Sequence, residues 1–179
     1  LEALATGLFA SAVGIVAGLI NGLLVVATRI NGFIVTLATM TVIAGLRYGV
    51  NGTGTYQGYS DGLVDFGGSS VAGLPVVFII AVLVALAVAF YFRRTLSGRY
   101  LLASGGNPVA ARLTGISNDK SIVVAHTLSG LLAGVAGVLV LMLSGSVNTS
   151  IGDDLLLPSF AAPIIGGVAL VGGAVSVLG

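Results

Sequence analysis

The stretch VAGLPVVFIIAVLVALAVAFYF, residues 71–92, decides the fold class, because its 22 positions contain no charged residue. A helix that crosses a membrane needs about 20 mostly apolar residues. Arg93 and Arg94 follow the stretch directly, and basic residues collect on the cytoplasmic side of membrane spans. The stretch therefore predicts a spanning helix whose end lies in the cytoplasm.

Four further apolar runs surround this one. They cover residues 3–28, 30–46 with an extension to 50, 121–143 and 155–178. The last run is interrupted by Pro158, Pro163 and two Gly-Gly pairs, and broken helices occur at membrane depth where they line a cavity or are buried in protein. We predict an all-α, polytopic membrane helix bundle, a single domain over residues 1–179, with about five membrane segments and a broken last one.

Composition supports this class and excludes others. Hydrophobic residues make up 56% of the chain and charged residues 7%, against about 25% charged residues in soluble domains. The net charge of +1, the absence of Cys and the single His argue against nucleic-acid binding, disulfides and metal clusters. No nucleophile stands with a base, so we expect no enzyme. The chain begins at Leu1, inside an apolar run, and we expect a fragment of a longer protein.

The charges of the connections predict their sides. The connection 93–120 carries five basic residues, whereas the connections 51–70 and 144–154 carry only acidic ones. We therefore place 93–120 in the cytoplasm and the other two outside. The acidic residues of the two outer connections are candidates for docking an external partner; they are Asp61, Asp65, Asp153 and Asp154. The alternative for the connection 51–70 is a solvated connector.

Small residues recur at helical spacing in two of the runs. One series is Gly14, Gly18 and Gly22, and the other includes Gly130 and Gly134. Such spacing lets helix backbones approach closely. We expect packing within one bundle, with a dimer interface as the alternative.

The cytoplasmic connection contains the signals of a short helix. Asn107 suits the N-cap, Pro108 the first helical position and Gly115 a left-handed end, which predicts a helix from Pro108 to Thr114.

The two faces of this short helix differ. Val109 and Leu113 lie four apart and are expected to sit against the bundle, which leaves Ala110 and Ala111 as a smooth side for another protein. A connector helix that merely ends a loop is the alternative.

Polar groups inside the runs are candidates for a solute path, because such groups need partners or water in hydrocarbon. Hydrogen bonding between helices is the alternative for each of them. Neutral hydroxyls and amides suit a neutral polyol better than an ion. The candidates are Asn21, Asn31, Thr36 and Thr39 in the early runs, with Ser159, Phe160, Gly166 and Gly167 in the broken segment.

Four blocks of the chain resemble one transporter family. The pattern at 105–116 resembles the coupling motif of ABC importer permeases of the ribose, or simple-sugar, type. Residues 21–40, 128–137 and 160–173 resemble further blocks of that family, in order along the chain. Two departures are Pro108-Val109, where the family usually has an acidic residue, and Ala174, where a basic residue is usual.

The resemblance implies a membrane permease subunit of an ABC importer in the inner membrane of a bacterium. It implies four partners: a second permease subunit, cytoplasmic ATPases that hold ATP and Mg²⁺, an external binding protein and a small solute, expected to be a sugar. We expect no cofactor in this chain itself, whose sequence lacks the glycine-rich loop that binds phosphate. A branched-chain amino acid permease and a secondary transporter or channel are the alternatives. The implied coupling residues are Gly105, Gly106, Asn107, Ala110, Ala111, Arg112, Leu113, Gly115 and Ile116.

Overall fold

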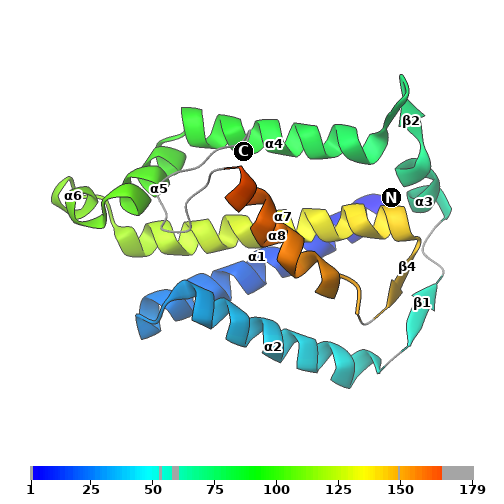
Figure 1. The fold of residues 1–179 in the computed structure, drawn as a ribbon, viewed down its shortest axis with the longest axis horizontal. Coiled ribbons are helices and arrows are strands. Elements are labelled where there is room, and N and C mark those ends of the chain that lie inside the picture. Colours follow the sequence, from blue (N-terminus) through cyan, green and yellow to red (C-terminus); the bar gives the residue numbers. More distant parts are fainter. Residues whose placement is uncertain (1, 53, 58–60, 149, 167–179) are drawn as a thin grey trace. The chain divides into compact units, whose positions relative to one another are not determined.

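The computed structural model describes residues 2–52, 54–57, 61–148 and 150–166 and is almost entirely helical (Figure 1). The prediction of an all-α chain is confirmed. The helices are α1 (Glu2–Thr28), α2 (Gly32–Asn51), α3 (Asp61–Gly68), α4 (Val76–Arg94), α5 (Leu96–Gly106), α6 (Pro108–Leu113), α7 (Asn118–Ser144), the 3-10 helix η1 (Asp153–Leu155) and α8 (Leu156–Ile165); the strands are β1 (Thr55–Gln57), β2 (Ser70–Val71), β3 (Leu74–Pro75) and β4 (Ser146–Asn148).

Four of these helices are long and apolar enough to cross a membrane, by length and composition. The spans are Ala5–Thr28, Gly32–Val50, Val76–Arg94 and Asn118–Ser144. They correspond to the first four predicted runs. Of the fifth run the structure describes only the first part, where α8 contains Pro163; residues 167–179 lie outside the described residues.

The chain divides into two compact units. One unit combines Leu1–Ile79 with Val123–Ile151, and the other combines Ile80–Ile122 with Gly152–Gly179. We call them the first and the second unit. Helices α4 and α7 each pass from one unit into the other.

The core of the first unit is a backbone contact between α1 and α7. A Cβ atom added at Gly134 would lie 2.6 Å from the carbonyl oxygen of Ala10, and one at Gly22 would lie 2.8 Å from Cα of Val123. Gly14 and Gly130 meet each other directly. The repeated glycines therefore pack helices within one chain, as the sequence predicts.

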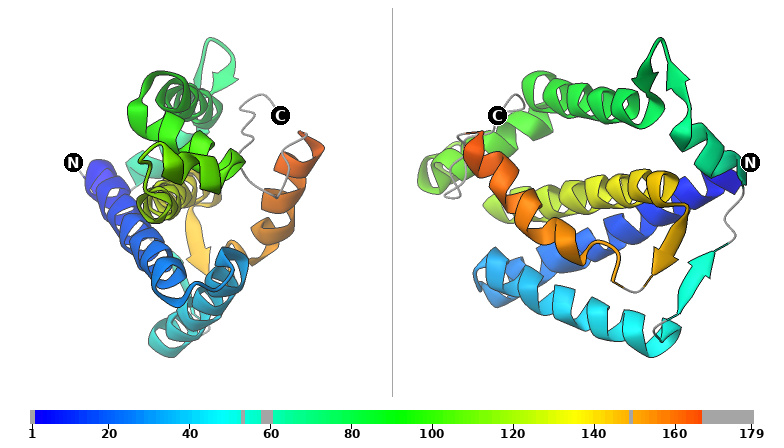
Figure 2. Two further views of the ribbon diagram at one scale, coloured as in Figure 1. Left: turned by 90° about the vertical axis from the view of Figure 1, so that its left-hand side faces the viewer. Right: turned by 45° about the vertical axis from the view of Figure 1, so that its right-hand side comes forward.

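The two predicted outer connections are joined in the first unit. Strand β1 pairs antiparallel with β4, with Thr55 opposite Asn148 and Gln57 opposite Ser146 (Figure 2). The segment that leaves α2 and the segment that leaves α7 therefore meet at one end of this unit. That this end lies outside the membrane stays a prediction from the charges of the two connections.

Three local features were not predicted. Residues 71–75 form a β2–β3 hairpin and not the start of a helix, because Ala72 and Gly73 take left-handed φ angles of 54° and 82°. The connection 51–70 contains β1 and α3, although its polar, glycine-rich sequence suggested a plain connector. The predicted cytoplasmic loop contains a second helix, α5, which begins because Thr95 accepts a hydrogen bond from the Gly98 N–H at 3.0 Å.

Candidate functional site

The short helix α6 is capped at both ends, as predicted. The Asn107 side chain accepts a hydrogen bond from the Ala110 N–H at 3.0 Å, and Pro108 occupies the first helical position. At the other end, the Gly115 N–H donates to the Arg112 carbonyl at 3.0 Å. Gly115 takes a φ of 82°, which glycine adopts without steric cost. The helix ends at Leu113, one residue before the predicted end, and Thr114 is its C-cap.

The exposure of α6 differs from the prediction at three residues, Val109, Ala111 and Leu113, whereas Ala110 is exposed as predicted. Ala111 is 4% exposed, whereas Val109 is 70% and Leu113 85% exposed. The C-terminal cap explains this orientation: the Ile116 N–H donates to the Ala111 carbonyl at 2.9 Å, and this motif brings an apolar residue after the helix onto its last turn. Val109 and Leu113 therefore form an outward apolar pair, and Ala111 anchors α6 to its own unit.

The remaining implied coupling residues are mostly exposed. Gly105, Gly106, Ala110 and Arg112 are exposed, and Ile116 is half-buried. A Cβ atom at Gly106 would meet no described atom within 4 Å, so packing inside the described chain does not require glycine there.

Two polar residues near α6 escaped the sequence analysis. Ser104 and Asn118 are 8% and 7% exposed, and the Ser104 hydroxyl donates to Asn118 Oδ1 at 2.9 Å. Asn118 Nδ2 in turn donates to the carbonyl oxygen of Pro108 at 2.9 Å. In sequence, Ser104 stands before two glycines and Asn118 begins a helix, so each resembles an ordinary turn or capping residue.

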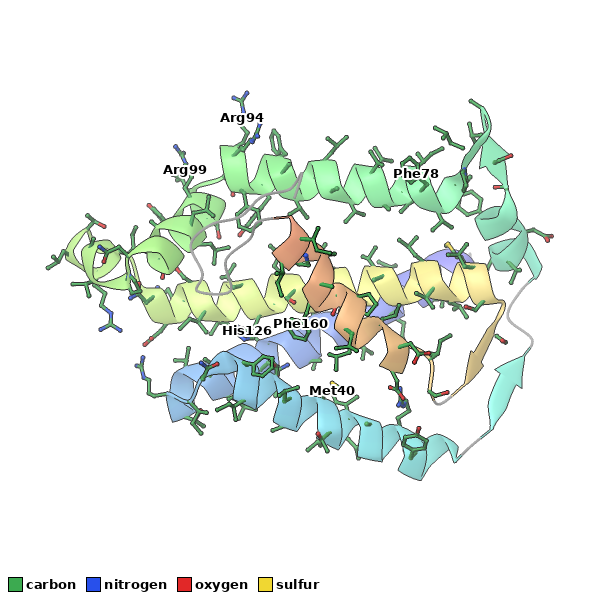
Figure 3. All side chains as sticks on the ribbon, viewed as in Figure 1. Met40, Phe78, Arg94, Arg99, His126 and Phe160 are labelled. Atoms are coloured by element: carbon green, nitrogen blue, oxygen red, sulfur yellow. The ribbon has the colours of Figure 1, made fainter. Side chains whose placement is uncertain are left out.

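Basic side chains surround this region of the second unit. Arg93 and Arg94 end α4, Arg99 lies on α5, and all three are exposed. Figure 3 shows Arg94 and Arg99 extending away from the helices that carry them. Residues 93–118 contain four Arg and no Asp or Glu, and Asp119 and Lys120 follow them, so this segment of the chain carries a net positive charge.

The early path candidates are largely bonded within their own helices. Asn31 caps α2 by accepting from the Phe33 N–H at 2.8 Å. The hydroxyls of Thr36 and Thr39 donate to carbonyls of α2, at 3.0 Å and 2.8 Å. Asn21 differs, because its buried Oδ1 has no hydrogen-bond partner among the described residues.

The later path candidates belong to the second unit. The Ser159 hydroxyl donates to the Leu156 carbonyl at 2.7 Å, and Gly166 caps the end of α8. Phe160 is 37% exposed. Gly167 lies outside the described residues.

The predicted docking carboxylates fall on two elements. Asp65 is exposed on α3, and Asp153 and Asp154 are exposed in η1. Asp61 begins α3, but its side chain is not described. Across the described residues, no group of three or more His, Cys, Asp or Glu side chains could hold a metal ion.

Four apolar spans and a capped helix flanked by basic residues define a multi-pass membrane protein. The chain belongs to the family described as the branched-chain amino acid transport system / permease component, whose profile matches residues 2–178. This bears out the family resemblance seen in the sequence.

Curated relatives carry a more specific name. The chain is 31% identical over 173 residues to the autoinducer 2 import system permease protein LsrD of Yersinia enterocolitica, and 30% identical to that of Photorhabdus luminescens. The corresponding Escherichia coli K12 protein is 31% identical over 172 residues. Each comparison covers 93% of this chain and 52% of the relative, so the chain spans about half the length of the curated relatives it matches. No solved structure gives a significant match.

Proposed function

We propose that this chain is part of the permease of an ATP-driven importer, and that α6 is where a cytoplasmic ATPase binds. The observation that carries the proposal is the outward pair Val109 and Leu113 on a helix whose opposite side, at Ala111, is anchored. A short helix fixed on one side and apolar on the other suits insertion into a groove of a second protein. Membership of a transport permease family supports this assignment.

The charge near α6 adds to the case. Arg112 projects from the same short helix, and Arg93, Arg94 and Arg99 are exposed in the same unit. Apolar contact at the centre with charges at the rim is the usual anatomy of a protein interface. We therefore expect an ATPase groove that is apolar inside and acidic at its edge.

A co-purification experiment tests the docking face. The full-length permease is expressed with candidate ATPase subunits, and ATPase retention is compared among wild type, Val109→Glu and Leu113→Glu in mild detergent. Each charged variant should lose at least tenfold in retention, because a carboxylate replaces an apolar contact at the interface centre. Leu96→Glu is the matched control, since Leu96 is 61% exposed on the neighbouring helix α5.

The outcomes separate the alternatives. Loss of the ATPase from both α6 variants but not from Leu96→Glu supports α6 as the docking helix. Retention in all variants would show that the pair Val109 and Leu113 is not the docking face. A wild type that holds no ATPase would make a secondary transporter or channel the leading function.

The proposed solute is a small, neutral, sugar-like molecule taken from an external binding protein at a bacterial inner membrane, between two permease subunits. In the four spans, Asp, Lys and Arg stand only in the first or last five positions, so the span interiors offer hydroxyl and amide groups and the single imidazole of His126. The similarity to autoinducer 2 import permeases supports this class of solute. The family description, which names branched-chain amino acids, supplies the competing class.

Uptake into proteoliposomes distinguishes the two classes. The complete transporter, with its binding protein and internal ATP, is offered labelled ribose, labelled leucine and autoinducer 2 in turn. ATP-dependent uptake of ribose or autoinducer 2 but not of leucine is expected. Uptake of leucine alone, or of none of the three, would contradict the sugar-like assignment.

A further inference from the structure

A buried amide joins three helices of the second unit. Asn118, the first residue of α7, contacts Ser104 in the last turns of α5 and the carbonyl of Pro108, the first residue of α6. Both polar side chains are more than nine-tenths buried. Buried polar contacts that are fully satisfied hold their partners in one arrangement, since breaking one leaves a desolvated group without a partner.

The orientation of this amide follows from its partners. The Pro108 carbonyl can only accept, so the nitrogen of the Asn118 side chain must face it. The oxygen then faces Ser104, whose hydroxyl donates to it. The amide oxygen and the amide nitrogen therefore each make a separate hydrogen bond. A substitution can remove one of these hydrogen bonds and keep the other.

The contact gives α6 a second attachment to α7. The first attachment is the chain itself, which leaves the C-terminal end of α6 through Thr114–Ser117 and contains the left-handed Gly115. Asn118 holds the opposite end of α6, at Pro108. A helix that is joined to α7 at one end only can pivot relative to α7 about the glycine, whereas a helix joined to α7 at both ends moves together with it.

Helix α7 extends this connection. It runs without interruption from Asn118 to Ser144, and from Val123 onward it belongs to the first unit, where Gly130 and Gly134 pack on the backbone of α1. When the first turn of α7 is displaced, the rest of α7 is therefore displaced with it, because the helix is continuous.

We propose that Asn118 is a positioning residue that locks α6 to α7, so that a push of the ATPase on α6 moves α7 and is not absorbed at Gly115. The lock rests on the proposed function for its role in transport, because a bound ATPase supplies the push. The lock itself is a property of this chain and can be measured with or without the ATPase.

The test uses Asn118→Asp in the full-length permease. Aspartate has nearly the same shape and keeps the oxygen that Ser104 needs, but it presents an oxygen to the Pro108 carbonyl. It also suits the first turn of a helix, so α7 should still begin there. Spin labels at Arg112→Cys on α6 and Lys120→Cys on α7 report the relative motion of the two helices. Both positions are exposed, and native cysteines outside residues 1–179 are first replaced by serine, because this stretch has none.

The distance distribution between the labels is measured in nanodiscs without ATPase, with ATPase, and with ATPase trapped by ATP, Mg²⁺ and vanadate. In wild type a narrow distribution should stay unchanged in all three states. In Asn118→Asp the distribution should be at least twice as wide and should shift on trapping. Ser104→Ala keeps the Pro108 contact and should be intermediate. Ser121→Ala is the matched control, because Ser121 is buried but bonds within the start of its own helix, to the Ser117 carbonyl.

Each outcome decides a separate question. Identical distributions in wild type and Asn118→Asp would overturn the lock. A broadened Asn118→Asp that no longer retains ATPase would show that Asn118 only shapes the docking helix, and transmission would be rejected. If wild type retains no ATPase while the distance distribution of Asn118→Asp is still broadened, the attachment of α6 to α7 by Asn118 is supported. Its role in transport is then rejected together with the proposed function.

Discussion

Gly14 on α1 and Gly130 on α7 lie against each other with their backbones in contact, and a Cβ atom at either position would collide with the carbonyl of the other. The same contact continues at Gly134, where a Cβ would lie 2.6 Å from the Ala10 carbonyl oxygen. A backbone oxygen cannot turn aside as a flexible side chain can. The α1–α7 distance is therefore set by the absence of a Cβ atom at five glycines, namely these three together with Gly18 and Gly22.

The first prediction concerns this contact. Gly130→Ala should destabilise the folded chain by about 1–3 kcal/mol, the usual cost of forcing an extra carbon into a packed interface. Gly137→Ala is the control on the same helix, because no described atom lies within 4 Å of its Cβ position. Alanine favours helix over glycine by about 1 kcal/mol, so the control should be neutral or stabilised. Thermal unfolding of both variants in detergent measures the difference, and equal behaviour would contradict the contact.

The second prediction concerns the start of α6. Asn107→Ala removes the acceptor for the Ala110 N–H and should weaken the helix by about 1 kcal/mol. Amide hydrogen exchange at Ala110 should accelerate roughly five- to tenfold as a result. Asn107→Asp preserves the acceptor and should leave the exchange rate close to that of wild type. Slow exchange in Asn107→Ala would mean that the cap does not hold the helix.

The third prediction concerns the end of α6. Gly115→Ala places a Cβ on a residue with a φ of 82° and should cost about 1–2 kcal/mol. Gly106→Ala is the control, because it ends the neighbouring helix α5 with no described atom near its Cβ position. Limited proteolysis between residues 107 and 118 should be faster in Gly115→Ala alone. Equal cleavage of both variants would argue against a left-handed cap.

The fourth prediction separates a structural from a functional asparagine. Asn21→Leu removes a buried oxygen that has no hydrogen-bond partner among the described residues, so it should leave the unfolding temperature unchanged or higher. Asn31→Leu, by contrast, removes the cap of α2 and should cost about 1 kcal/mol. If Asn21 lines the solute path, ATP-dependent uptake should fall in Asn21→Leu despite its stability. Unchanged uptake would remove Asn21 from the path candidates.

The membrane helices could be predicted from the sequence because the hydrocarbon of a bilayer requires mostly apolar side chains along the whole length of a span. Long apolar runs therefore gave the four spans. The caps of α6 were equally readable, because Asn107, Pro108 and Gly115 each satisfy a local backbone need. Such signals depend on neighbours in the chain and not on the rest of the fold.

Contacts between distant residues were not readable in this way. The inner face of α6 was predicted from two apolar side chains four residues apart, Val109 and Leu113, which were favoured over Ala111. The observed orientation depends instead on how the cap turns Ile116 back toward Ala111. The bond between Ser104 and Asn118 joins residues fourteen apart, and neither residue type indicates its partner. The β2–β3 hairpin was missed because Val71 and Leu74 are as apolar as the helix that follows them.

The pairing of β1 with β4 bears on how such a permease can change over time. The two short segments are joined by an antiparallel backbone ladder, and the backbone hydrogen bonds of such a ladder do not depend on which side chains the strands carry. Substitutions in residues 55–57 and 146–148 can therefore alter the chemistry presented on that end of the unit while the loops stay joined. A lineage can therefore change this surface without changing the helices that carry it.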